Sequence, residues 1–273
     1  MAVGRERLIS GTPMVGTKKS LGQHWLKNRA ILNDIADLSL LGIEGSAYDS
    51  SDDNLICVEI GPGLGFLTSS LLKRFSKVIA VEYDDRLAEN LPKSFPGTNL
   101  EVVKGDILEY DFSSIKEPYV ISGNIPYYIT SPIIEKVLTC SPLPKRIVLL
   151  MQKEVAERIV SDKETVLSLF VKNRAEVFAG PVVKAEEFTP PPKVDSEVVV
   201  FEPFKVPKVS NEVFDLIKQG FKAPRKKLIH NLSGLKSKEE LVGIFKEIGI
   251  SVDVRPGDLR LEDWGDLYKK IDS

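Results

Sequence analysis

Three features that could bind a nucleoside follow successive apolar runs in this chain. The first is the glycine-rich segment Gly61-Pro62-Gly63-Leu64-Gly65, the second is Glu82, 21 residues after Gly61, and the third is Asp106. Open α/β sheets bind ligands at the carboxyl ends of their parallel strands, where all three would meet. A carboxylate at Glu82 can accept hydrogen bonds from both hydroxyls of a ribose, and one at Asp106 can accept from an adenine amino group. Together these features predict a bound nucleoside cofactor.

The spacing of the glycines indicates which cofactor this is. The pattern is G-x-G-x-G, whereas dinucleotide sites have G-x-G-x-x-G and hold a pyrophosphate at a helix N-terminus. S-adenosylmethionine has no phosphate, and its sulfonium and methionine portion need a close approach to the backbone, which glycine permits. Because Glu59 stands just before the turn, we predict S-adenosylmethionine, held by Gly61, Gly63, Glu82 and Asp106.

A candidate methyl-acceptor site follows the fourth apolar run, in Gly123-Asn124-Ile125-Pro126-Tyr127-Tyr128. An adenine N6 amine is a poor nucleophile because its lone pair is delocalised into the ring. The carboxamide oxygen of Asn124 and a backbone carbonyl of Ile125 or Pro126 could each accept one N–H and aim the lone pair, while Tyr127 could stack on an extruded base. Positioning and electrostatics would drive such a reaction without a strong general base. In isolation the segment could be a strand-ending turn; after a glycine-rich cofactor segment it predicts an acceptor site.

Short apolar runs that alternate with helical patterns must position these residues. This alternation predicts a mostly parallel sheet covered on both faces, a Rossmann-like α/β fold. A helix is expected over 29–41, ended by Gly42, and the runs 167–178 and 194–201 could form an antiparallel pair at the sheet edge. The expected strands are 55–60, 77–82, 100–103, 119–122 and 146–151, and the expected helices between them are 66–74, 85–91 and 132–138.

A second, smaller domain is expected after Pro207, where the pattern changes to short basic helices. Ser237 and Glu240 form a capping-box pattern that opens a helix, which Gly249 can close. Near the end, Trp264, Leu267, Tyr268 and Ile271 share one helical face. We therefore predict a catalytic domain over 1–206 and a helical, RNA-facing domain over 207–273.

Charge is unevenly distributed along the chain. Residues 204–238 contain nine Lys or Arg and two Asp or Glu, and residues 1–30 contain six basic residues and one acid, so these segments carry +7 and +5. The net charge is −2, so the rest carries −2 − 7 − 5 = −14. An acidic body with two basic segments is typical of a protein that meets a polyanion on one surface, although solvated basic faces would give the same totals.

Other sequence features exclude several classes of protein. No run approaches the ~20 apolar residues of a membrane span, and the N-terminus has no signal-peptide pattern. The two cysteines, Cys57 and Cys140, suggest neither a disulfide framework nor a metal site. We expect a cytoplasmic protein with no metal that acts as a monomer.

From about Lys18 to Leu267 the chain resembles the small-subunit ribosomal RNA adenine dimethyltransferases, a family of class I methyltransferases. The family is identified by five motifs: Lys18-Lys19-Ser20-Leu21-Gly22-Gln23-His24-Trp25-Leu26, Glu59-Ile60-Gly61-Pro62-Gly63-Leu64-Gly65, Gly123-Asn124-Ile125-Pro126-Tyr127, Phe188-Thr189-Pro190-Pro191-Pro192-Lys193-Val194-Asp195-Ser196 and Arg255-Pro256-Gly257-Asp258-Leu259.

The resemblance implies roles that spacing alone does not give. His24 and Leu26 would contact the cofactor, and Asn124 would help to complete its pocket. Phe188 would sandwich the target adenine against Tyr127. The segment 221–232, with Arg225, Lys226 and Lys227, would match the family's basic RNA-facing helix. Family members methylate two adjacent adenosines in a hairpin near the 3′ end of small-subunit RNA, with two methyls on each.

Several positions depart from the family pattern, in which Asn-Phe is usual at 24–25. His24-Trp25 stands there instead, which leaves the side-chain contact at position 24 open. Tyr128 replaces a usual Asn and could add a stacking or hydroxyl contact. Thr165 stands in place of a Tyr-Gly pair, which shortens a loop expected to border the substrate cleft.

Two other functions remain open from the sequence. A large-subunit ribosomal RNA adenine methyltransferase of the macrolide-resistance type shares the glycine-rich and Asn-x-Pro-Tyr motifs, and Ile125 is found there; the segments 190–196 and 255–259 favour the small-subunit enzymes. A non-catalytic RNA-binding assembly factor could keep the same fold, but the intact acceptor motif argues against lost catalysis.

Overall fold

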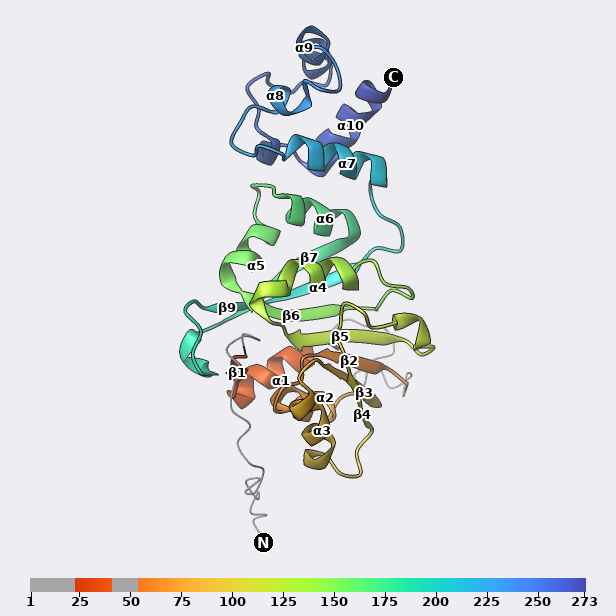
Figure 1. Ribbon diagram of the computed structural model, residues 1–273, viewed down its shortest axis with the longest axis vertical. Helices are drawn as coiled ribbons and strands as arrows, with labels where there is room; N and C mark the ends of the chain where they lie inside the picture. The colour runs from red at the N-terminus through yellow and green to blue at the C-terminus, as the bar shows by residue number, and fades with distance from the viewer. Residues whose placement is uncertain (1–22, 41–53) are drawn as a thin grey trace.

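The computed structural model describes residues 23–40 and 54–273, so the basic segment before residue 23 and the predicted helix end at Gly42 lie outside the described residues. Its centre is a seven-stranded sheet (Figure 1). The strands are β2 (Ile56–Ile60), β3 (Lys77–Glu82), β4 (Leu100–Lys104), β5 (Tyr119–Asn124), β6 (Ile147–Gln152), β7 (Ala175–Val183) and β9 (Ser196–Pro203).

The sheet has the order β4-β3-β2-β5-β6-β9-β7, in which the first five strands are parallel. Strand β9 is antiparallel to both of its neighbours. The order reverses at β2, whose two neighbours are β3 and β5, and in open α/β sheets the ligand crevice lies at such a reversal. The topology therefore places the glycine-rich turn, which follows β2, at the expected binding position.

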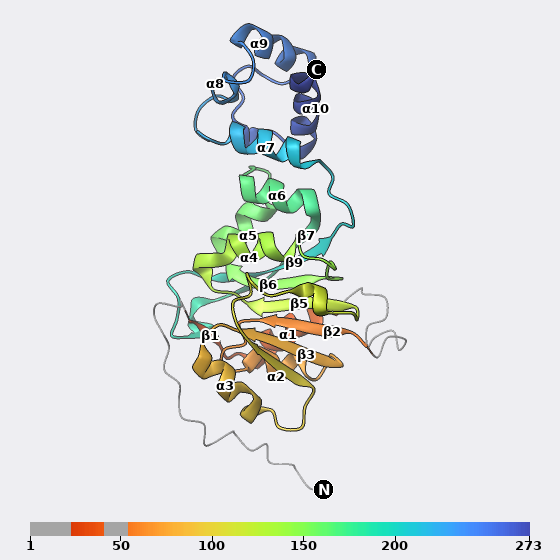
Figure 2. The ribbon, with the colours of Figure 1, turned by 45° about the vertical axis from the view of Figure 1, so that its right-hand side comes forward.

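Helices cover both faces of the sheet (Figure 2), which explains why β2, β5 and β6 are mostly apolar and buried along almost their whole length. Apolar side chains of α1 (Arg29–Leu38) and α2 (Phe66–Leu71) form one core cluster with one face. Those of α4 (Thr130–Val137), α5 (Lys153–Val160) and α6 (Val166–Arg174) form a second cluster with the other face. A further helix, α3 (Asp85–Ser94), packs beside β3 and β4.

The run 167–178 does not form a single strand, which corrects the sequence expectation. Its first part is the helix α6, opened by a capping box between Thr165 and Ser168, and only Ala175 onwards is strand. Leu169, Phe170 and Val171 are all buried, so the run lacks the exposed positions that would reveal a helical period. The expected antiparallel pair at the sheet edge is confirmed, with Ala175 opposite Pro203.

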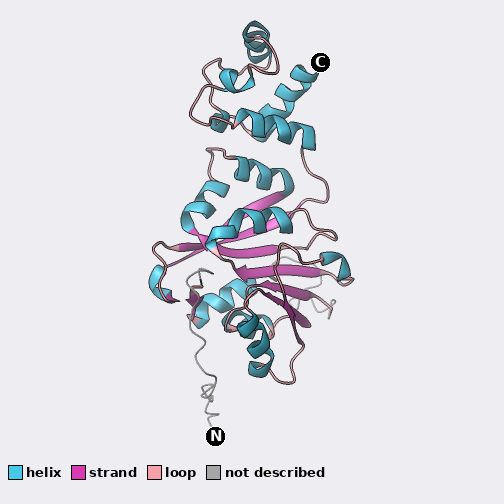
Figure 3. Cartoon of the chain, viewed as in Figure 1, coloured by secondary structure: helices cyan, strands magenta, loops and turns pink. Residues whose placement is uncertain are grey.

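Four helices follow β9. They lie together beyond α5 and α6, on the side away from the sheet (Figures 1 and 3). They are α7 (Asn211–Gly220), α8 (Leu228–Leu232), α9 (Lys238–Glu247) and α10 (Leu261–Asp272). The capping box at Ser237 and the end of α9 at Gly249, which has φ +76°, are confirmed. Trp264 and Leu267 are buried as expected for the inner face of α10. The predicted boundary at 206/207 falls between β9 and α7.

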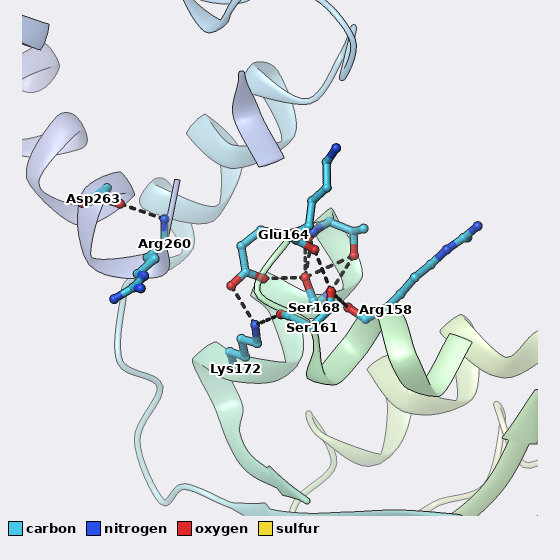
Figure 4. Close-up of polar contacts among 9 residues, drawn as sticks. Arg158, Ser161, Glu164, Ser168, Lys172, Arg260 and Asp263 are labelled. Carbon is cyan, nitrogen blue, oxygen red and sulfur yellow. Dashed lines mark hydrogen bonds and ion pairs between the residues drawn. The ribbon is translucent and has the colours of Figure 1, made fainter. Parts of the chain in front are cut away.

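The loop around Thr165 lies where these helices meet the sheet layer (Figure 4). The amide of Glu164 donates to the carbonyl of Gly257 over 2.9 Å. The buried Glu164 carboxylate accepts from Ser168 Oγ and pairs with Lys172 Nζ at 2.7 Å. The loop packs against the segment 255–259, and the cavity described below is lined by other residues, so its expected position beside the substrate cleft stays a prediction.

Candidate active site

A cavity of about 320 Å³ opens at the carboxyl ends of β2, β3 and β5 and beside the end of β4. It is lined by residues from five separate segments of the chain, which the parallel strands bring to one edge of the sheet. The cavity brings together eight of the residues that the sequence singled out: His24, Gly61, Gly63, Glu82, Asp106, Asn124, Pro126 and Tyr127.

The glycine-rich turn adopts a backbone that other residues would resist. Gly61 has φ +62° and Gly63 has φ +58°, a region that costs L-residues about 1–2 kcal/mol. A Cβ on Gly63 would also lie 3.2 Å from Nε1 of Trp25. The absence of side chains therefore lets a ligand approach this backbone, and the Trp25 indole packs beside Gly63.

Glu82 is 6% exposed and is held by two backbone donors at the end of β3. Its Oε2 accepts from the amide of Gly63 over 3.0 Å, and its Oε1 accepts from the amide of Asp84 over 2.8 Å. Burial raises the pKa of this carboxyl, and the two amide donors oppose that rise. Each oxygen retains a lone pair that can accept from a ribose hydroxyl.

Asp106 lines the cavity two residues after the end of β4. Its Oδ1 accepts from the amide of Leu108 over 2.9 Å, which fixes the carboxylate at the cavity wall. Two lining tyrosines are largely exposed nearby, Tyr83 at 62% and Tyr128 at 60%. The cavity mouth therefore combines one anchored acid with two aromatic rings that solvent can reach.

The orientation of Asn124 is fixed by a contact with the N-terminal segment. Its Nδ2 donates to the backbone carbonyl of His24 over 2.9 Å, so its Oδ1 is the amide atom that can accept an N–H in the cavity. The carbonyl of Pro126 already accepts from the amide of Ile129 over 3.3 Å. Of the two carbonyls that the sequence left open, Ile125 is therefore the better second acceptor.

Tyr127 is held at both its hydroxyl and its ring. Its hydroxyl shares a 2.7 Å hydrogen bond with Ser196 Oγ. The ring of His24 stacks on it with centroids 5.8 Å apart and an interplanar angle of 17°. His24 Nδ1 in turn lies 2.7 Å from the carbonyl oxygen of Pro190, which requires that this nitrogen carry the proton.

Leu26 and Phe188 lie outside the cavity lining. They are opposite each other in a small antiparallel pair, β1 (Trp25–Leu26) with β8 (Phe188–Thr189). Each side chain is 2% exposed and belongs to the core cluster beneath β1. The β1–β8 pair positions the 23–25 segment and the 188–190 segment beside the cavity. Direct contacts of Leu26 and Phe188 with ligands stay predictions.

Sequence reasoning did not assign roles to Trp25 and Tyr83, both of which line the cavity. Tyr83 follows the strand-end acid Glu82 directly, so its position was a usable signal. The role of Trp25 depends on its contact with Gly63, which is distant in sequence and left no signal.

The basic residues Arg225, Lys226 and Lys227 are exposed, but they do not lie in a helix as expected. They form the turn that precedes α8, whose residues are only Leu228–Leu232. Lys227 Nζ pairs with Asp253 at 2.5 Å. The turn therefore presents two cations toward solvent and a third that is shared with an acid.

Across 23–40 and 54–273, no helix is both long and apolar enough to span a bilayer. The same residues contain no group of three or more His, Cys, Asp or Glu that could hold a metal ion.

Two crystal structures share this architecture. A dimethyladenosine transferase from Plasmodium falciparum superposes with a TM-score of 0.74 at 30% identity, covering 89% of this chain and 96% of that one. The 23S rRNA methyltransferase ErmE superposes with a TM-score of 0.72 at 24% identity, covering 91% and 100%, which shows the fold. The mostly parallel sheet and its glycine-lined cavity are those of a Rossmann-like class I methyltransferase, as expected.

Sequence comparison narrows this class to one family. The model of the family described as ribosomal RNA adenine dimethylase matches residues 14–273. Ribosomal RNA small subunit methyltransferase A of Rippkaea orientalis is 36% identical, over 90% of this chain and 94% of the relative. The protein of the same name from Mycoplasma capricolum is 32% identical, over 93% and 97%. The chain belongs to the ribosomal RNA adenine dimethylase family.

Proposed function

We propose that this protein transfers methyl groups from S-adenosylmethionine to N6 of two adjacent adenosines in the 3′-terminal hairpin of small-subunit ribosomal RNA. The product is N6,N6-dimethyladenosine. The observation that carries the proposal is the fixed orientation of Asn124, whose amide oxygen is available in the same cavity as Gly61, Gly63 and Glu82. The names of the relatives, which are small-subunit methyltransferases, support the choice of RNA.

The cavity residues fit S-adenosylmethionine. Gly61 and Gly63 offer an open backbone for its methionine portion, and a Cβ on Gly61 would meet no atom within 4 Å, so this space is free for a ligand. Glu82 would accept from the ribose hydroxyls and Asp106 from the adenine amino group. When bound, the cofactor supplies a methyl group activated by the sulfonium.

The chain's own residues would prepare the acceptor nitrogen. Asn124 Oδ1 and the carbonyl of Ile125 accept its two hydrogens and turn its lone pair toward the cofactor side of the cavity. Tyr127, fixed through Ser196, offers a ring on which the extruded base stacks. The N6 ammonium formed by transfer is strongly acidic and loses its proton to water. Positioning therefore accounts for the catalysis without a general base.

The proposed partner is the RNA of an immature small ribosomal subunit, bound by a monomer of this protein. The charge pattern supports contact with RNA on the surface that carries the turn 225–227. A role in small-subunit assembly would follow from binding a subunit that is not yet complete.

Asn124→Ala tests the acceptor assignment. Loss of one positioned hydrogen-bonding group typically costs about 10²–10³ in turnover, so methyl transfer should fall at least that far while RNA binding persists. Asn90→Ala, at a half-buried residue of α3 whose amide bonds only within its own helix, is the matched control and should behave as the unchanged protein. Unchanged turnover in Asn124→Ala would refute the assignment.

Methyl transfer to isolated subunits tests the choice of RNA. Immature small and large subunits from cells lacking this protein should be compared as substrates, with the products located by mass spectrometry. We expect dimethyladenosine only in the small-subunit RNA. Transfer to the large-subunit RNA would instead assign the protein to the macrolide-resistance type, whose fold it shares.

A further inference from the structure

The ring of His24 lies between Tyr127, on which the proposed function stacks the target base, and the segment 188–190, in which the family resemblance assigns Phe188 to the base. On one side it stacks on Tyr127, which follows the acceptor residue Asn124. On the other side its Nδ1 donates to the carbonyl of Pro190, two residues after Phe188. These contacts, one aromatic face and one polar edge, are the kind that an extruded adenine makes with a base pocket.

The surroundings of His24 leave its side chain able to move. Its backbone carbonyl holds Asn124 in place, so the acceptor residue depends on the main chain at position 24 and not on the imidazole. The imidazole hydrogen bond to Pro190 is accessible to solvent. Rotation of the side chain would therefore open the face of Tyr127 while Asn124 keeps its orientation.

We propose that the imidazole of His24 occupies the adenine position in the RNA-free enzyme and that the target adenine displaces it to stack on Tyr127. The inference rests on the proposed function, because it takes Tyr127 as the stacking surface for the base. His24 is then a specificity residue, because only a group that stacks on Tyr127 better than imidazole gains binding free energy by displacing it. The free energy needed to break the two His24 contacts also lowers the apparent affinity for RNA.

Proton NMR of the full-length protein tests the displacement without requiring methyl transfer. The chain contains only His24 and His230, so two imidazole Hε1 signals are expected, and the His24→Asn variant identifies which is which. In the free protein the ring current of Tyr127 should shift the His24 signal. Two hairpin RNAs are then compared, one with adenine at the target position and one with an abasic residue there, both with S-adenosylhomocysteine present.

The adenine RNA should abolish the ring-current shift of His24, whereas the abasic RNA should leave it in place. A His24 signal that stays unchanged with the adenine RNA, or that changes equally with both RNAs, would overturn the inference. Binding is followed separately by fluorescence anisotropy. If neither RNA binds, the proposed function fails and this inference with it; if both bind and the signal does not respond, only this inference fails.

Two variants provide a second readout in steady-state kinetics. His24→Ala removes the stacked ring, and His24→Phe keeps a planar ring that can still occupy the face of Tyr127. A stacked pair of this kind corresponds to roughly a two- to tenfold change in an equilibrium constant. We expect the KM for RNA to fall by that factor in His24→Ala and not in His24→Phe. A KM that rises in His24→Ala would show that His24 supports the bound base and would refute displacement.

Discussion

At the scale of single residues, Glu59 is a buried carboxyl whose protonation at neutral pH is altered by its surroundings. It lies directly before the glycine-rich turn, is 1% exposed, and accepts a 2.6 Å hydrogen bond from Thr68 Oγ1. Burial, opposed by Thr68 and reinforced by the nearby Glu82, raises the pKa of Glu59 from 4.5 to about 8. The folded protein therefore holds a proton here at neutral pH that the unfolded chain releases.

This proton predicts the direction of the pH dependence of stability. Between pH 4.5 and about 8 the folded state binds more protons than the unfolded state at Glu59, so the unfolding free energy falls as pH rises through that window. Glu59→Gln, which keeps an acceptor for Thr68, should remove this part of the decline and gain on the order of a few kcal/mol above about pH 8. Urea unfolding across the pH range measures it. Parallel curves for the two proteins would contradict the prediction.

Gly63 offers a second prediction at this scale. Gly63→Ala places a Cβ against the indole of Trp25 in a backbone with φ +58°, next to the amide that holds Glu82. We expect the affinity for S-adenosylmethionine to fall about tenfold, the equivalent of about 1.4 kcal/mol, as measured by calorimetry. Gly97→Ala is the matched control, because Gly97 also has positive φ (+73°) but meets no atom within 4 Å of its Cβ. Equal loss in both variants would indicate general strain.

Site residues at the ends of strands could be predicted from the sequence, whereas contacts between distant segments could not. Glu82 and Asn124 were found because each ends a strand, and Asp106 because it lies two residues after one; parallel strands bring their ends together whatever the detailed packing. The stack of His24 on Tyr127 joins residues about a hundred positions apart and depends on the pairing of β1 with β8. No local sequence pattern predicts such a contact, so the sequence did not indicate what the side chain of His24 contacts.

At the scale of elements, strands were easier to predict than the helices near the sheet edge. The runs that became β2, β3 and β5 are mostly apolar and almost entirely buried because both their faces are covered, and their lengths are those of strands. The helix α6 is buried on most sides, so its residues gave the same signal as a strand. The helix α5 is only eight residues long and was not predicted at all. Burial on all sides removes the periodicity on which such predictions depend.

The packing of α7 against α10 can be tested with one methyl group. A Cβ on Gly220, the last residue of α7, would lie 2.3 Å from Cη2 of the fully buried Trp264. Overpacking of this kind costs about 1–3 kcal/mol, so Gly220→Ala should destabilise the protein by that amount in urea unfolding. Gly243→Ala, in the open part of α9, should be neutral or stabilising. If Gly220→Ala unfolds like the unchanged protein, Trp264 must have room to shift.

At the scale of the whole molecule, the basic turn and the candidate active site face the same direction. In Figures 1 and 2 the connection between α7 and α8 lies on the same side as β1, which borders the cavity. The polar contacts between Glu164 and Gly257 and between Asn173 and Val209 tie the helical part to the sheet layer. One RNA hairpin could therefore contact the turn with its backbone while a base enters the cavity.

Replacing Arg225, Lys226 and Lys227 by Gln should weaken RNA binding and flatten its salt dependence, with little change in cofactor affinity. Each free cation that contacts a phosphate adds about one unit to the slope of log Kobs against log salt. Because Lys227 is already paired with Asp253, the slope should fall by about two units and not by three. A charge-matched control replaces the exposed lysines at 73, 93 and 116, outside the basic turn, and should keep the slope. Equal flattening in both variants would mean that RNA responds to net charge alone, and parallel loss of cofactor binding would indicate misfolding instead of a lost RNA contact.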